Sequence, residues 1–79
     1  MSIRNEAALG HALRQHRLTK DLNQTELGQK ARLRQKTVSD LEQGRGGTLA
    51  SLFALLTAMG LEITVVPRED RDIDLDRYL

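Results

Sequence analysis

Five polar side chains lie close together between residues 35 and 40, and their types suit hydrogen bonding with the edges of nucleic-acid bases. Glutamine can bond adenine at two atoms, lysine can donate to O6 and N7 of guanine, aspartate can accept from N4 of cytosine, and serine or threonine suits several base edges. A polar helix face can also be simply solvated, so residue types alone leave both interpretations open. The five are Gln35, Lys36, Thr37, Ser39 and Asp40.

These side chains belong to the second of two short helices predicted in the centre of the chain. Asn23 followed by Glu26 has the spacing of a capping box, so a helix begins there and ends near Ala31. After a turn at 32–34, a second helix runs to a stop at Gly44, with apolar residues on one stripe only. Two such helices joined by a three-residue turn predict a helix-turn-helix, whose second helix lies in the DNA major groove.

Three motifs in this stretch resemble the phage-repressor-like (Xre or Cro/C1 type) helix-turn-helix family over about residues 9 to 60. They are Leu22-Asn23-Gln24, Glu26-Leu27-Gly28 and Val38-Ser39-x-Leu41-Glu42-x-Gly44. The resemblance implies a phosphate or base contact by Gln24 and a structural ion pair between Arg17 and Glu42. It also implies base contacts along the start and outer face of the second helix, at Arg34, Gln35, Lys36, Thr37, Ser39 and Asp40.

Two residues depart from the family pattern. Arg32 stands where the family usually has glycine, at a cost of about 1 kcal/mol if its backbone is left-handed. Arg34 stands where serine or threonine often caps the second helix, so it forfeits the cap but places a cation near the expected DNA.

The remaining helices and loops are predicted to support this pair. A first helix is expected from about Glu6 to Leu18 and a last one from Leu49 to about Ala58. The last helix is apolar over most of its circumference, so part of it is expected to face a second subunit. The loop before it is either a plain turn or a phosphate-contacting segment in which Arg45, Gly46 and Thr48 take part.

The segment 61–67 is the one strand candidate, because a β-branched run there ends at Pro67. A single strand has no partner in its own chain, so we expect it to pair with the same strand of a second copy. Leu61, Ile63 and Val65 are its predicted dimer residues. The expected domains are therefore a DNA-binding domain at 1–60, this dimerising strand, and an acidic, mobile tail at 68–79.

A helix-turn-helix domain followed directly by "GLEITVVPR" is similar to the HipB-type antitoxins. The resemblance implies a repressor of its own operon that binds a HipA-like kinase toxin. The predicted fold is all-α, a lambda-repressor-like helix-turn-helix bundle of four to five helices with one C-terminal β-strand that pairs across a homodimer. Its partner would be double-stranded DNA with a pseudo-palindromic operator. The alternatives are a phage-type regulator without a toxin, and a protein-interaction module that binds no DNA.

Composition excludes several other classes. The 79 residues contain no cysteine, which removes disulfides and thiolate metal sites. His11 and His16 lack the spacing of a metal pair, and the alternating tail aspartates lack the glycine and glutamate of a calcium loop. No cofactor, no metal site and no enzymatic activity are expected.

Charge is divided along the chain. Residues 1–66 hold nine basic against six acidic residues, and residues 67–79 hold three against five. A basic folded part suits a phosphate-facing surface. No stretch is long and apolar enough to cross a membrane, and the expected location is the cytoplasm.

Overall fold

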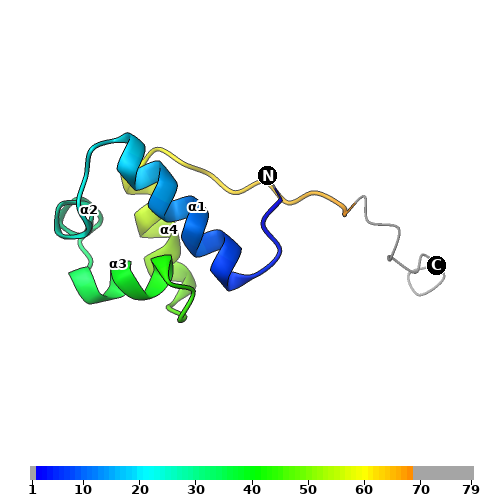
Figure 1. Cartoon of the computed structure of the whole chain (residues 1–79), viewed down its shortest axis with the longest axis horizontal. Helices are drawn as coiled ribbons and strands as arrows, with labels where there is room; N and C mark the ends of the chain where they lie inside the picture. Colours follow the sequence, from blue (N-terminus) through cyan, green and yellow to red (C-terminus); the bar gives the residue numbers. More distant parts are fainter. Residues whose placement is uncertain (1, 69–79) are drawn as a thin grey trace.

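Four helices make up the regular structure of residues 2–68, the part of the chain that the computed structural model describes (Figure 1). They are α1 (Glu6–Thr19), α2 (Gln24–Ala31), α3 (Gln35–Glu42) and α4 (Leu49–Ala58). The predicted all-α helix-turn-helix bundle is confirmed, with four helices. The tail predicted at 68–79 lies outside the described residues, apart from Arg68.

Side-chain caps explain where three of the helices begin. The Asn5 side chain accepts a hydrogen bond from the backbone N–H of Ala8 at the start of α1. Asn23 and Glu26 form a complete capping box at α2, and Thr48 accepts from the backbone N–H of Ser51 at α4. Each cap satisfies backbone donors that have no partner inside the helix. At α3 the cap position is Arg34, which makes no side-chain capping bond, as predicted.

The core lies where all four helices meet. Helix α3 packs against α1 and α2, and α4 packs against α2 and more lightly against α3. Burial of each leucine-sized side chain stabilises the fold by about 1.5 to 3 kcal/mol. The short α2 and α3 therefore depend on packing for their stability, since helices of eight residues are marginal alone. The buried apolar residues are Leu13, Leu27, Val38, Leu41, Leu52, Leu55, Leu56 and Met59.

Helix α1 approaches the end of α3 with backbone against backbone. A β-carbon at Gly10 would lie 2.3 Å from the carbonyl oxygen of Glu42 and 2.6 Å from that of Leu41. Only glycine fits such a contact without moving one of the helices. The contact brings α1 close enough for its later residues to reach the carboxylate of Glu42.

Helix α4 is only partly covered by the rest of its own chain. Leu52, Leu55 and Leu56 enter the core, whereas Leu49 is 73% exposed and Phe53 is 51% exposed. Part of the apolar surface of α4 is therefore left uncovered within one chain, and its expected contact with a second subunit stays a prediction. The two exposed side chains are four residues apart, so they share one face of the helix.

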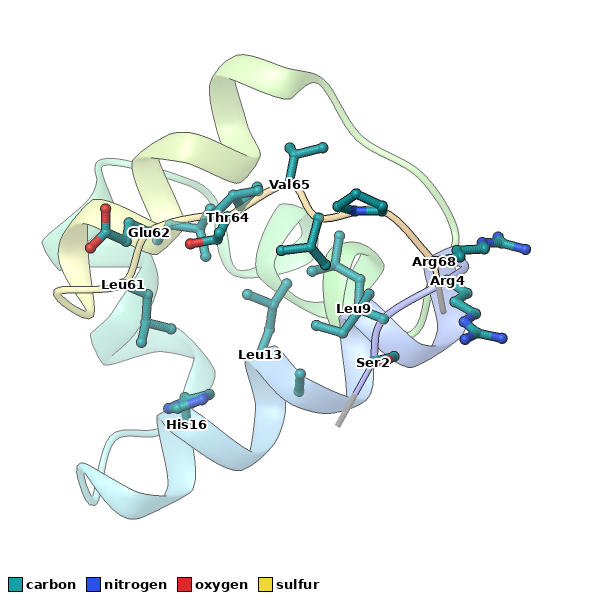
Figure 2. A pocket seen from close by; sticks show the side chains of 16 residues that line it. Ser2, Arg4, Leu9, Leu13, His16, Leu61, Glu62, Thr64, Val65 and Arg68 are labelled. Carbon is teal, nitrogen blue, oxygen red and sulfur yellow. The ribbon is translucent and has the colours of Figure 1, made fainter. Parts of the chain in front are cut away.

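The segment after α4 runs back along α1 as extended chain. The N–H of Leu61 bonds the carbonyl of Leu56, and Leu61 packs against the core. Residues 61–68 and the segment Ser2 to Arg4 border a groove with Leu9 and Leu13 of α1 (Figure 2). Within residues 2–68 no strand is formed, and pairing of 61–67 with a second copy stays a prediction.

Candidate nucleic-acid interface

A tight turn sets the angle between α2 and α3. Arg32 has φ 58°, in the left-handed region, and the N–H of Leu33 bonds the carbonyl of Gly28 at 2.8 Å. A β-carbon at Gly28 would lie 2.7 Å from the carbonyl oxygen of Leu33, so glycine is needed for this close approach. The turn has helix-turn-helix geometry even though Arg32 replaces the glycine common in similar sequences.

Helix α3 buries one stripe and leaves its other face open. Val38, Leu41 and Glu42 point inward. The residues predicted to contact bases fall on the remaining surface. Arg34, Gln35 and Lys36 are exposed, and Thr37, Ser39 and Asp40 are half-buried. The structure thus brings all six together on one polar surface of α3 and the turn before it.

Beneath this surface, Arg17 and Glu42 form a buried ion pair, the pair implied by the family resemblance. The Arg17 Nε donates to Oε2 of Glu42 at 2.6 Å, and Nη2 donates to Oε1 at 2.9 Å. Their side chains are only 8% and 2% exposed. The third Arg17 nitrogen, Nη1, donates to the carbonyl of Leu22 at 2.8 Å. Hydrogen bonding to Glu42 raises the pKa of Arg17 above its already high ordinary value, so the guanidinium of Arg17 stays charged.

Two glutamines continue this network to the surface of α3. The Gln24 amide nitrogen donates to Oε1 of Glu42 at 3.2 Å. The Gln24 amide oxygen accepts from the amide nitrogen of Gln35 at 2.7 Å. A chain of hydrogen bonds therefore joins α1 to the first residue of α3. No local sequence pattern indicates these contacts, because Gln24 and Glu42 are 18 residues apart.

Asp40 holds two cations on the same surface. Lys36 Nζ lies 3.0 Å from Oδ2 of Asp40, and Arg45 Nη2 lies 2.9 Å from Oδ1. The hydrogen bond from Lys36, and to a smaller extent the one from Arg45, lowers the pKa of Asp40 below its ordinary value. The Lys36 contact has the i, i+4 spacing that a helix sequence indicates, whereas the Arg45 contact depends on the following loop.

The predicted phosphate-contacting residues are divided between loop and helix. Arg45, Gly46 and Thr48 are exposed, and open space surrounds Gly46. The Thr48 hydroxyl is already engaged with Ser51 at the start of α4. Gln24 is half-buried and hydrogen-bonded to both Glu42 and Gln35. It is therefore the most constrained of the four predicted phosphate-contacting residues.

No metal-binding group is found among residues 2–68, where no three histidine, cysteine or acidic side chains converge. None of the helices in the same region has the length and hydropathy needed to span a membrane.

Two short helices joined by a tight turn, with a polar outer face on the second, define the class of helix-turn-helix DNA-binding regulators. Residues 8–70 match the helix-turn-helix domain family, and the chain belongs to that family. Members of this family are DNA-binding regulators and not enzymes. The expectation that the chain is a DNA-binding regulator without enzymatic activity is thus confirmed. A search of curated protein sequences finds no match.

The fold is similar to that of HipB in solved complexes. A chain of the HipA-HipB-O2-O3 complex superposes with a TM-score of 0.80 and 26% sequence identity, over 87% of this chain and 99% of that chain. A chain of the HipB-O4 20mer complex superposes with a TM-score of 0.81, at the same identity and coverage. The predicted resemblance to HipB-type helix-turn-helix proteins is thus confirmed.

Proposed function

We propose that the chain is a homodimeric repressor that binds a pseudo-palindromic operator and regulates its own operon as the antitoxin of a HipBA-like module. The observation that carries DNA recognition is the polar surface of α3, held by a tight turn above a buried ion pair. The proposal assigns base contacts to Arg34, Gln35, Lys36, Thr37, Ser39 and Asp40, and phosphate contacts to Gln24, Arg45, Gly46 and Thr48.

Exposed apolar side chains support the dimer. Phe53 on α4 is 51% exposed, Ile63 is 45% exposed and Val65 is 91% exposed. A contiguous exposed apolar surface favours a partner, and Ile63 and Val65 lie on the same short segment. In the proposed dimer, residues 61–67 pair with their copy, and the two α3 helices enter successive major grooves about 34 Å apart.

Base contact by Gln35 is tested with a Gln35→Ala variant in a titration on the chain's own promoter and on random duplex DNA. We expect a loss of about 1 to 3 kcal/mol on the promoter and little change on random DNA. An equal loss on both duplexes contradicts base recognition by Gln35.

Binding of the wild-type chain to DNA should also weaken steeply with added salt, as phosphate contacts require. A contact through apolar surface, as in the protein-interaction alternative, lacks this salt dependence.

The toxin partner is supported by the similarity to HipB chains, one of which is solved together with HipA. The test is co-purification of the product of the adjacent reading frame with the tagged chain, followed by a promoter titration of the complex. Recovery of a kinase-like protein that stays bound at the promoter supports the antitoxin role. Promoter binding without any partner instead supports the alternative of a regulator without a toxin.

A further inference from the structure

Asp40 places a negative charge on the surface that is proposed to meet DNA. Residues 34–45 contain three basic side chains, Arg34, Lys36 and Arg45, and two acidic ones, Asp40 and Glu42. Glu42 is buried in its ion pair, whereas the Asp40 side chain is 26% exposed and opens onto the polar surface of α3. A carboxylate in this position repels the phosphates of DNA, so it weakens the sequence-independent part of binding.

Both oxygens of the Asp40 carboxylate hold a cation. Oδ2 lies 3.0 Å from Nζ of Lys36, and Oδ1 lies 2.9 Å from Nη2 of Arg45. The backbone N–H of Arg45 also bonds the carbonyl of Asp40 at 2.9 Å, so this part of the loop is fixed to the end of α3. Both cationic side chains are exposed, so DNA phosphate can reach them. Asp40 and phosphate therefore compete for the same two cations.

This competition has a different result on operator and non-operator DNA. Binding to an arbitrary sequence depends on phosphates, and a cation that moves to a phosphate leaves an oxygen of Asp40 without a donor. At an operator, base edges are held against the same surface, and the N4 amino group of cytosine can donate to a carboxylate. Asp40 can then exchange a cation for a base donor. At an arbitrary sequence no base is held in that place, so the loss is not offset.

We propose that Asp40 is a specificity-determining residue, which lowers the affinity for non-operator DNA by holding Lys36 and Arg45, while a base of the operator offsets this loss. The proposal rests on the proposed function, since it needs α3 in the major groove and Arg45 near phosphate. The ion pairs on α3 thus act against binding at the wrong sequence.

The test compares a duplex from the chain's own promoter with a random duplex of equal length, by fluorescence anisotropy with the full-length chain. Asp40→Asn keeps the shape of the side chain and removes its charge. We expect affinity for the random duplex to rise by about 3- to 10-fold at about 0.1 M salt, the contribution of one phosphate-neutralising charge. On this duplex the slope of log affinity against log salt should steepen by about 0.9. Affinity for the promoter should stay within about twofold of wild type or fall, because the weakened base contact offsets the change in charge.

Glu62→Gln is the matched control for net charge. It removes one negative charge from the exposed segment that follows α4, outside the polar surface of α3 (Figure 2). Because salt screens exposed charges beyond about 10 Å, this variant should leave the preference for the promoter unchanged. Helical circular dichroism checks that each variant is folded, and Asp40→Ala provides a second neutral replacement.

A double-variant cycle tests whether Asp40 acts through a cation that it holds. In the wild-type chain, Lys36→Met removes a cation that Asp40 already neutralises, so affinity for random DNA should fall by less than about twofold. In the Asp40→Asn background the same substitution removes a cation that no carboxylate holds, and the loss should reach about 3- to 10-fold. Simple addition of charges predicts equal losses in the two backgrounds.

The outcomes distinguish the inference from the proposed function. If the wild-type chain binds its promoter no more tightly than random DNA, the proposed function fails. The inference alone is overturned, and the proposed function stands, if the promoter is preferred but Asp40→Asn leaves affinity for random DNA unchanged. Equal gains on both duplexes, or equal losses from Lys36→Met in both backgrounds, overturn the inference in the same way.

Discussion

Replacing Arg17 by methionine should cost a large part of the stability of the domain. The substitution removes both hydrogen bonds to Glu42 and the bond to the carbonyl of Leu22. The carboxylate of Glu42, 2% exposed, would keep only the 3.2 Å bond from Gln24. Stranding one charge of a buried pair costs about 3 to 5 kcal/mol. A chain of this length has a total stability of about 4 to 12 kcal/mol.

The measurement is urea denaturation followed by helical circular dichroism, at one fixed protein concentration because a dimer would make stability concentration-dependent. Arg14→Met is the control, since Arg14 is exposed on the same helix. A double variant, Arg17→Met with Glu42→Leu, should recover much of the loss, because it removes the stranded charge as well. If Arg17→Met costs no more than Arg14→Met, the ion pair does not stabilise the fold.

Three further outcomes follow from the geometry. Gly10→Ala should lower the free energy of unfolding by about 1 to 3 kcal/mol in the same assay, because its β-carbon would overlap the α3 backbone. Arg32→Gly should raise the free energy of unfolding by about 0.5 to 1 kcal/mol, because glycine adopts the left-handed backbone without strain. The gain is partly offset, because glycine also gives the unfolded chain more conformational entropy. An NMR titration should place the Asp40 pKa below the ordinary aspartate value of about 3.9, and Lys36→Met should raise it more than Arg45→Met does. Because the folded pKa is the lower one, the stabilisation from Asp40 is present above pH 4 or so and is lost as the pH falls through the folded pKa.

Helix positions could be predicted from the sequence because their signals are local. Asn23 with Glu26, and Thr48 before α4, satisfy backbone donors within three residues, and the structure contains both caps. At Arg32 the sequence left two possibilities, a left-handed backbone or a differently shaped turn, and the structure has the left-handed one. Local chemistry of this kind acts before any tertiary contact is made.

The contacts beneath α3 could not be predicted from spacing. The bonds from Gln24 to Glu42 and to Gln35 depend on how α2 and α3 cross, which no periodicity specifies. The sequence predicted that part of α4 is left uncovered by its own chain, but which residues are exposed, here Leu49 and Phe53, depends on how the other helices cover it. Both are properties of packing between elements and not of any one element.

The division of α3 into a buried stripe and an outer polar face has an evolutionary consequence. Substitutions on an exposed face usually change stability by less than about 0.5 kcal/mol. Lys36 and Arg34 can therefore be exchanged for other residues while Val38 and Leu41 continue to hold the helix in place. Duplicated copies of such a gene could acquire separate target sequences quickly without first losing their fold. Gln35 would change more slowly than its neighbours, because a new residue there would also have to suit Gln24.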